Sequence, residues 1–370
     1  MAKKKEVDKS KDSSMDDFFA KIDKQMGGGV IKSGDDDCFE IKRISSGIPE
    51  LDLALGGGYP VSKHVQIKGK EHVGKSWMCF KAIAQLHKDD PKAYAVYINV
   101  ENLVDRNWAK KIGVDLKRMK IVEGELTAEE FWDIVSKLLS NPNIKIIVLD
   151  SLALMAPRKE ITEKNGSMNA FTTQSVATQA QTNTQAMRAI NYKMKNNSAV
   201  IIYINQIRYK VGQLYGNPET SPGGQAIKHQ LAVDISVRKG KYYPDEKNGE
   251  NATGHYINLK VTKNKTYKEQ QTASFIMMRD GSLNEVAGVL AMAKELDYLE
   301  ECGIKSGNTY TVNGEKVAKN IREFEEYLKK DKKTLNKIRE GVNSILLNEG
   351  NEYELSLEAN DDDFTEEELN

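Results

Sequence analysis

The chain lacks any apolar run of the roughly 20 residues that a membrane-spanning helix needs, and it is poor in cysteine. Its N-terminal sequence, MAKKKEVDKSKD, has no apolar stretch after the lysines, so we expect no secretory signal. The three cysteines, Cys38, Cys79 and Cys302, are far apart and form no CxxC or metal-binding spacing. These absences predict a cytoplasmic protein with reduced thiols and no membrane association.

The chain also lacks net charge, but its charges are unevenly distributed. Residues 340–370 hold 11 of the 54 acidic residues and none of the 54 basic ones, so the other 339 residues carry a net charge of +11. A basic body with an acidic tail occurs in nucleic-acid binders and also in proteins with a solubilising disordered end. At 370 residues, with 39% hydrophobic and 29% charged residues, the chain is globular and fits one large domain with accessories, or about two to three domains.

Strand and helix patterns alternate from about residue 38 onward. Short apolar runs at 65–68, 95–100, 144–149 and 199–204 predict strands, and helical patterns lie between them at 76–88, 128–139 and 172–195. This alternation predicts an α/β fold with a mostly parallel sheet covered by helices on both faces. An added β region is predicted at 231–238, 256–264 and 273–278. A small α-rich module follows, with helices at 285–299, 316–328 and 332–347.

Residues 69–76, GKEHVGKS, form a G-x4-G-K-S pattern between a predicted strand and a predicted helix. In such a phosphate loop the glycines let backbone N–H groups turn toward phosphates, and the helix N-terminus adds partial positive charge. The lysine then contacts the β- and γ-phosphates, and the serine hydroxyl binds Mg²⁺. The predicted nucleotide-binding residues are Gly69, Lys70, Glu71, His72, Val73, Gly74, Lys75, Ser76 and Trp77.

Two carboxylates follow predicted strands. Asp150 ends the strand at 144–149 and can hold the Mg²⁺ through water. Glu101 follows the strand at 95–100 and can orient or deprotonate a water that attacks the γ-phosphate. Asp105 and Trp108 could face the base and the ribose. On the residues alone, a solvated Glu101 in a turn and a Trp108 in the core remain open alternatives.

Residues 204–224, INQIRYKVGQLYGNPETSPGG, join the end of a buried strand to a long cationic loop. The strand ends on Asn205 and Gln206, in the place where α/β sheets bind their ligands. Arg208, Lys210 and several glycines in the loop suit a polyanion. An ordinary connection is the weaker alternative, because structureless loops of this length inside a domain are usually functional or disordered. The segment therefore predicts a small-ligand site next to a polymer site.

These segments together resemble the bacterial RecA recombinase family over about residues 15–345. The resemblance is carried by RISSGIPELDLALGGG (43–58), the phosphate loop, VEN and KKIGVDL within 100–116, VLDSLALMAP (148–157), QAMR (185–188), the segment 204–224, KNK (263–265) and YTVNGEKVAKN (310–320). The phosphate loop is shared by a vast superfamily, whereas the segment 204–224 together with KNK is specific to this family.

The resemblance implies ATP and Mg²⁺ as cofactors, with Ser76 and Asp150 at the metal. It makes Glu101 the carboxylate that activates water, and it places Asp105 and Trp108 at the adenine. Gln206 would sense the γ-phosphate, and two lysines would reach the ATP of the neighbouring protomer, where they would neutralise charge only in a stacked assembly. The catalytic residues implied are Glu101, Lys75, Gln206, Lys263 and Lys265.

The resemblance also implies sequence-tolerant contacts with DNA. Arg188 matches a backbone-binding arginine, and Met168 lies in the first DNA loop. Departures are a first loop about six residues longer than usual, Gln181 in place of a basic residue and His229 in place of an aromatic residue at the protomer interface. The residues that match the second DNA loop are Arg208, Lys210, Val211, Thr220, Ser221, Gly223 and Gly224.

Four parts are expected along the chain. Residues 1–37 would be a disordered lead and an oligomerisation segment with a short helix at 16–26. Residues 38–281 would form a RecA-type ATPase and DNA-binding core. Residues 282–347 would form a small domain that captures duplex DNA, and residues 348–370 an acidic disordered tail that acts as a brake.

The function implied is an ATP-dependent homologous recombinase. It would form a helical homo-oligomeric filament on single-stranded DNA, pair it with homologous duplex and exchange strands, with DNA-stimulated ATP hydrolysis, in a nucleoid-associated location. A damage-response repressor is a candidate partner. Alternatives are a RecA-fold motor (a helicase or branch-migration ATPase), which would lack the GNPET-type loop with KNK, and a non-hydrolysing DNA-coating filament, against which the intact phosphate-loop residues argue.

Overall fold

The computed structural model describes residues 9–34, 36, 40–99, 104–124, 126–150, 173–209, 219–220, 224–243, 251–307, 309–342 and 344–345. At 9–14, 173–181, 208–209, 219–220, 224–226 and 295 only the backbone is described. The chain divides into two compact units, Met1–Lys42 and Arg43–Asn370. None of the described helices has the length and apolarity needed to span a bilayer.

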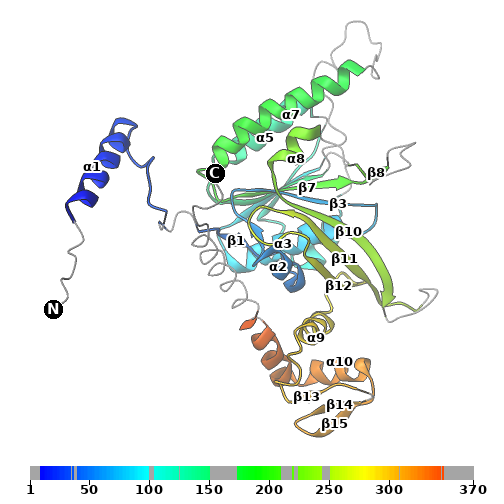
Figure 1. The fold of residues 1–370 in the computed structure, drawn as a ribbon. Coiled ribbons are helices and arrows are strands. Elements are labelled where there is room, and N and C mark those ends of the chain that lie inside the picture. Colours follow the sequence, from blue (N-terminus) through cyan, green and yellow to red (C-terminus); the bar gives the residue numbers. More distant parts are fainter. Residues whose placement is uncertain are drawn as a thin grey trace, which may run out of the picture. The chain divides into compact units, whose positions relative to one another are not determined.

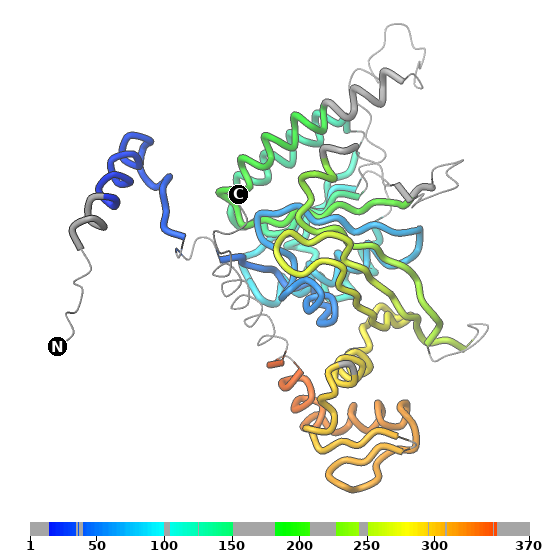
Figure 2. The backbone as a smooth tube through the Cα atoms, in the orientation of Figure 1, coloured from blue at the N-terminus to red at the C-terminus, as the bar shows by residue number. Residues whose placement is uncertain are grey.

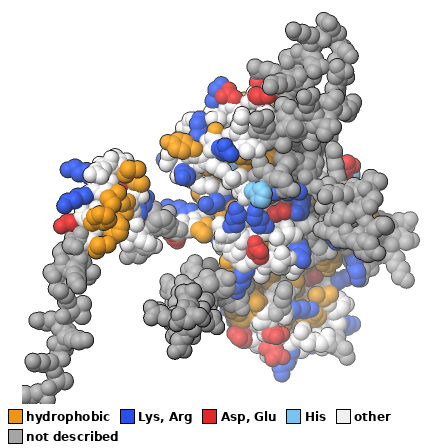
Figure 3. All heavy atoms as spheres, turned by 45° about the horizontal axis from the view of Figure 1, so that its top comes forward, with side chains coloured by type: hydrophobic (Ala, Val, Ile, Leu, Met, Phe, Trp, Pro, Cys, Tyr) orange, Lys and Arg blue, Asp and Glu red, His pale blue; other side chains and the backbone are white. Residues whose placement is uncertain are grey.

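In its described residues the first unit contains one helix, α1 (Lys9–Gln25), which begins earlier than the predicted short helix. Three glycines with positive φ follow it, and the Asp23 carboxylate accepts hydrogen bonds from the backbone N–H groups of Gly29 (2.7 Å), Val30 (2.6 Å) and Ile31 (2.8 Å). These bonds, led by the one from Ile31, hold the pKa of Asp23 below its usual range. Hydrophobic side chains gather on the surface of this unit (Figure 3): Met15, Phe18, Phe19, Met26, Val30 and Ile31.

The second unit is built around one large mixed sheet (Figure 1). In the described part of the chain its eight strands follow the order β12-β11-β10-β3-β7-β6-β4-β5. The strands from β10 to β5 are parallel, and β11 and β12 add an antiparallel edge. The α/β fold with a mostly parallel sheet is therefore confirmed. The strands are β3 (His64–Gly69), β4 (Tyr94–Asn99), β5 (Met119–Val122), β6 (Ile144–Asp150), β7 (Val200–Gln206), β10 (Leu231–Tyr243), β11 (Gly254–Asn264) and β12 (Thr272–Met278).

Helices cover both faces of this sheet, as the tube view also shows (Figure 2). On one face α2 (Pro49–Leu55), α3 (Lys75–Asp89) and α4 (Arg106–Ile112) pack on a core that includes Ile67 and Ile202. On the other face α5 (Ala128–Leu138) and α7 (Thr173–Met194) pack on Ile201 and Tyr203, with α8 (Gly224–Gln230) beside them. Alternating side chains of β4, β6 and β7 thus serve two separate cores. Two short pairs complete this part: β1 (Arg43–Ile44) with β2 (Tyr59–Pro60), and β8 (Arg208–Tyr209) with β9 (Glu219–Thr220).

The C-terminal region has its own core and differs from the predicted run of helices. It contains α9 (Glu285–Glu295), β13 (Ile304–Lys305), β14 (Tyr310–Val312), β15 (Glu315–Ala318) and α10 (Ile321–Lys330), and residues 332–342 are helical. The helix predicted at 316–328 is wrong in its first part. Asn313 and Gly314, with φ of 51° and 87°, form the tight turn of a β14–β15 hairpin, and Asn320 then caps α10.

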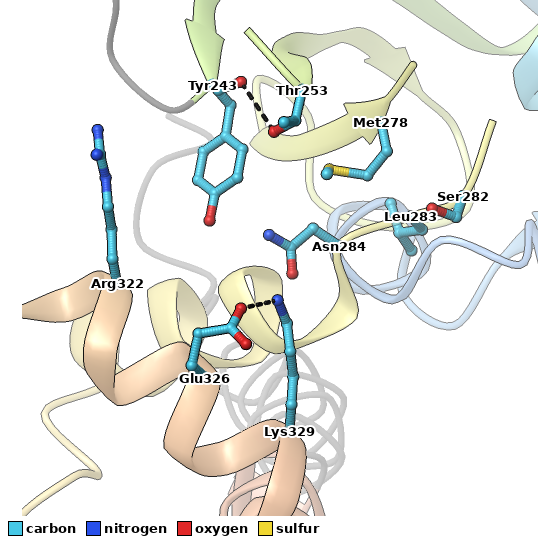
Figure 4. A pocket seen from close by; sticks show the side chains of 9 residues that line it. All are labelled: Tyr243, Thr253, Met278, Ser282, Leu283, Asn284, Arg322, Glu326 and Lys329. Atoms are coloured by element: carbon cyan, nitrogen blue, oxygen red, sulfur yellow. Dashed lines mark hydrogen bonds and ion pairs between the residues drawn. The ribbon is translucent and has the colours of Figure 1, made fainter. Parts of the chain in front are cut away.

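The C-terminal region contacts the end of β10 and helix α2 through a small interface. Tyr243, at the end of β10, donates a hydrogen bond to Glu325 on α10. Glu50 on α2 is 4% exposed and lies against α9, where a Cβ at Gly288 would come within 1.6 Å of its Oε1. A pocket of about 520 Å³ lies at the same interface (Figure 4). Its lining residues are Tyr243, Thr253, Met278, Ser282, Leu283, Asn284, Arg322, Glu326 and Lys329.

Candidate functional site

The predicted phosphate loop lies between β3 and α3, as expected from its pattern. Gly69 ends the strand and could not be another residue without a shift, because a Cβ there would lie 2.5 Å from the carbonyl oxygen of Val237. Gly74, which caps α3, has a φ of 90° that glycine adopts readily. The loop therefore keeps its glycines for close backbone packing and for its turn into the helix.

Lys75, the first residue of α3, folds its side chain back over the loop. Its Nζ donates to the carbonyl oxygens of Gly69 (3.1 Å) and Lys70 (2.6 Å), and the residue is only 8% exposed. A cation at the N-terminus of α3 adds to the positive end of the helix dipole. Loop and lysine together thus offer the charge that phosphate oxygens require.

Ser76 and Asp150 come together although they are far apart in sequence. The Ser76 hydroxyl donates to Asp150 Oδ2 at 3.3 Å, and the Tyr97 hydroxyl on β4 donates to the same oxygen at 2.5 Å. Burial, and then the charge of Asp150, raises the pKa of Tyr97 well above its usual range, so its hydroxyl keeps its proton. Among the described residues the buried Nδ2 of Asn99, in register with Asp150, has no hydrogen-bond partner.

These residues fit a nucleotide and a magnesium ion in their chemistry. A hydroxyl oxygen and a carboxylate oxygen of the kind that Mg²⁺ prefers are side by side at the start of α3 and the end of β6. The phosphate loop, which ends at Lys75, directly precedes Ser76 along the chain. The buried amide of Asn99 offers a further donor at this edge of the sheet.

Asp105 and Trp108 have local roles in the structure. The Asp105 carboxylate accepts from the backbone N–H groups of Asn107 (2.9 Å) and Trp108 (3.0 Å) and so caps α4. The Trp108 ring packs where a Cβ of Gly281 would be, 2.8 Å from its Cη2, and Trp77 Nε1 donates to the Gly281 oxygen at 2.9 Å. Trp108 is partly buried against the core, and its contact with adenine stays a prediction.

Gln206 is the last residue of β7 and lies in register with Gly69 on β3. The backbone N–H of Ile207 donates to the Gly69 oxygen at 3.3 Å, so the ladder continues past the strand end. The structure therefore places the start of the cationic segment directly beside the phosphate loop.

Lys263 and Lys265 lie near the end of β11 and contact helix α8. Lys263 Nζ donates to the Lys228 oxygen at 2.9 Å, and Lys265 Nζ donates to the His229 oxygen at 3.0 Å. Burial, and then the charge of Lys265, lowers the pKa of Lys263, whereas Asp234 and Glu269 raise it. Two cations thus hold the C-terminal carbonyls of α8, where the helix dipole is negative.

Part of the predicted site lies outside the described residues. This holds for Glu101, Met168, Lys210, Val211, Ser221 and Gly223. Arg208, Thr220 and Gly224 are described by their backbone alone, and Arg208 pairs with Thr220 between β8 and β9. Arg188 is exposed on α7.

Sequence reasoning missed two sets of residues. Tyr97 stands two residues before the end of β4, a position whose side chain shares a face with the strand end. Gln66 and Lys68 on β3 bind Asp234 on β10. The polar residues of β3 could have indicated this cluster, because the sequence of a central parallel strand is normally an apolar run.

Comparison with known proteins agrees with this geometry. A family model of the RecA N-terminal domain matches residues 13–283. The chain is 32% identical over 341 residues to proteins called Protein RecA from Francisella philomiragia subsp. philomiragia and from Francisella tularensis subsp. novicida. Each alignment covers 91% of this chain and 90% of the relative. With its phosphate loop, its magnesium-type oxygen pair and its cationic segment at the adjoining strand end, the chain belongs to the RecA family.

Proposed function

We propose that this chain is an ATP-dependent homologous recombinase. It assembles as a helical filament on single-stranded DNA, pairs that strand with homologous duplex and exchanges strands, and DNA stimulates its ATP hydrolysis. Membership in the RecA family supports a recombinase role in general, with ATP and DNA binding. The finer activities rest on the site residues.

One observation carries the proposal: Gly69 of the phosphate loop and Gln206 are cross-strand neighbours. A side chain at that place can contact the γ-phosphate of a nucleotide bound on the loop. The chain runs on from Gln206 into Arg208 and the rest of the cationic segment. The proposed nucleotide site and the proposed DNA site are therefore only a few residues apart along the chain, as a DNA-responsive ATPase requires.

Each site residue has a separate proposed role in ATP hydrolysis. Lys75 and the loop N–H groups would bind the phosphates, and Ser76 and Asp150 would hold a magnesium ion, which would neutralise phosphate charge. Glu101 orients and deprotonates the attacking water. Lys263 and Lys265, which contact the carbonyls of α8 in the single chain, would reach the ATP of the neighbouring protomer, so turnover would depend on filament assembly.

DNA is held by charge and by backbone donors. Arg188 is exposed on α7, and Arg208 and Lys210 stand in the second loop. Contacts of this kind bind phosphates without reading sequence, as pairing of any homologous strand requires.

The decisive measurement is steady-state ATP hydrolysis with and without single-stranded DNA. We expect a clear rise in kcat with DNA for the wild type, and none for Lys75→Ala. Lys137→Ala on α5, a lysine whose side chain is 75% exposed, is the matched control and should behave as wild type. Equal rates with and without DNA would contradict the recombinase, and hydrolysis by Lys75→Ala would contradict the assigned phosphate loop.

Strand exchange separates this function from its alternatives. With ATP the protein should convert single-stranded circles and linear duplex to exchanged products, and with a non-hydrolysable ATP analogue it should pair them without full turnover. Unwinding of duplex without any pairing would instead identify a motor.

A further inference from the structure

Strand β3 carries polar side chains on a face where a buried parallel strand is normally apolar. It has β10 on one side and β7 on the other, both parallel to it. His64, Gln66 and Lys68 alternate along it and so point to one face, and His64 and Gln66 are 3% and 1% exposed. Buried polar groups are costly unless they are fully hydrogen-bonded, so this row needs partners.

The partners of Gln66 and Lys68 lie on the two neighbouring strands. Gln66 Nε2 donates to Asp234 Oδ1 at 2.9 Å, and Lys68 Nζ donates to Asp234 Oδ2 at 2.5 Å. Gln66 Oε1 in turn accepts from Asn205 Nδ2 on β7 at 2.6 Å. Asp234 on β10 is thus connected through Gln66 to the residue that precedes Gln206.

Asp234 also has a neighbour on its other side. In the antiparallel β10–β11 pair it stands directly opposite Lys263, so the two side chains share a face. The negative charge of Asp234 raises the pKa of Lys263, against the effects of burial and of Lys265. The Asp234 carboxylate on β10 therefore lies between two lysines on the flanking strands, Lys68 on β3 and Lys263 on β11.

This polar row and the ATP site lie on opposite faces of the same strands. Lys68 and Asn205 are in register, and the next residue of each strand, Gly69 and Gln206, points to the face covered by α3. A side chain that fixes Lys68 and Asn205 therefore fixes the backbone that presents the phosphate loop and Gln206.

We propose that Asp234 is a positioning residue for ATP turnover, which places a negative charge opposite Lys263 on β11 and, through Gln66, holds the end of β7 that carries Gln206. The inference rests on the proposed function, because it assigns Gln206 and Lys263 to the cis and trans sides of the nucleotide. The Asp234 side chain shares the face of Gln66 and Lys68, opposite the face on which α3 follows the phosphate loop. It acts by fixing β3 and the end of β7 relative to β10 and by setting the charge beside Lys263.

The first test compares charge removal with preserved shape. In Asp234→Asn the new amide oxygen can still accept from Gln66, but Lys68 and Lys263 lose their counter-charge. We expect the DNA-stimulated kcat to fall at least about tenfold while the KM for ATP changes less than about threefold, the signature of a lost transition-state interaction. Asp133→Asn, in an exposed ion pair with Lys137, is the matched control and should leave both constants unchanged.

A second variant guards against a folding defect. Lys68→Met with Asp234→Asn removes the cation together with its partner and leaves no unpaired charge on β3, so its melting temperature should stay near that of the wild type. Because Lys263 still lacks the opposing charge of Asp234, the kcat of the double variant should stay as low as in Asp234→Asn. A folded double variant with wild-type kcat would show that Asp234 serves stability alone and would overturn the proposal.

A third measurement does not depend on catalysis. Acylation of individual lysines by an amine-reactive reagent at pH 8, read by mass spectrometry, reports how readily Lys263 loses its proton. Without the negative charge of Asp234 the pKa of Lys263 falls, so its labelling in Asp234→Asn should be faster than in the wild type, relative to the exposed Lys137.

The outcomes separate the two ideas. No DNA stimulation in the wild type would contradict the proposed function, while faster Lys263 labelling would still show that the charge of Asp234 keeps this lysine protonated. DNA stimulation in the wild type, with unchanged kcat or unchanged Lys263 labelling in Asp234→Asn, would overturn the role of Asp234 alone.

Discussion

Gly69 and Gln206 are direct cross-strand partners at the carboxyl ends of β3 and β7. This register places the last residue of one strand beside the first residue of the phosphate loop. In the proposed function, linkage requires that ATP change the affinity for DNA by the same factor as DNA changes the affinity for ATP.

We predict that Gln206→Leu separates the two ligands. The apolar side chain keeps the volume but cannot hydrogen-bond a phosphate, so ATP affinity should change less than about threefold, while the DNA-induced rise in kcat is lost. Fluorescence titration of single-stranded DNA, with and without an ATP analogue, measures the coupling. An ATP-dependent gain in DNA affinity equal to that of the wild type would show that Gln206 is not the link.

Tyr97→Phe tests the second hydrogen bond to the predicted metal carboxylate. Without the hydroxyl, Asp150 Oδ2 loses the shorter of its hydrogen bonds from Tyr97 and Ser76, and its orientation is less constrained. Partners that orient metal ligands commonly contribute about tenfold or more to metal affinity or activity. The Mg²⁺ concentration for half-maximal hydrolysis should rise by about that factor, and an unchanged value would assign Tyr97 to packing alone.

Because Glu50 is buried, we expect the free energy of unfolding to fall as pH rises. Burial, with Glu285 and Asp52 nearby, raises the pKa of Glu50 from 4.5 to about 7, and its Oε2 has no hydrogen-bond partner among the described residues. The folded protein therefore holds this proton more tightly than the unfolded chain, and stability is lost between pH 4.5 and about 7. Glu50→Gln should be more stable than wild type by about 3 kcal/mol above pH 7 and about equal at pH 4. Urea unfolding at both pH values measures this, and an equal difference at both would contradict it.

His64 predicts the opposite dependence on pH. Its Nε2 lies 2.7 Å from Asn191 Oδ1 and its Nδ1 lies 2.8 Å from the Tyr203 hydroxyl, so a neutral ring donates to Asn191 and accepts from Tyr203. Burial lowers the pKa of His64 from 6.5 to about 4. Stability present above pH 6.5 should therefore be lost as pH falls through about 4, by about 3 kcal/mol.

The variant His64→Gln isolates this contribution. It cannot titrate, so the acid part of the stability curve between pH 6.5 and 4 should flatten relative to the wild type. Unfolding curves collected across this range provide the measurement. An equal acid slope in both proteins would assign the acid sensitivity to other groups.

The larger elements of the fold were predictable from local pattern. Apolar runs of strand length and helical periodicity located β3, β4, β6 and β7 to within about two residues. The hairpin at Asn313 and Gly314 was missed because Lys316, Val317 and Ala318 also suit a helix, and a two-residue turn overrode that preference. The short β5 and α4 were missed because few residues carry their pattern.

The candidate site was predictable only in part. Lys75 and Ser76 belong to a contiguous motif whose spacing alone defines its chemistry. Asp150 was expected from its place after an apolar strand, but the short bond from Tyr97 depends on β4 being the neighbour of β6. Strand order in a parallel sheet is decided by how crossover helices pack, which no local pattern reports.

The sequence by itself therefore determined the phosphate loop, the cationic segment after Gln206 and the alternation of strands and helices, because each depends on residues that are close along the chain. Only the tertiary structure decided that Gln206 lies beside Gly69, that Asp234 joins Lys68 and faces Lys263, and that Glu50 is buried against Gly288. Those pairings bring together residues distant in sequence, and they follow from the register of the sheet and the packing of helices on its two faces.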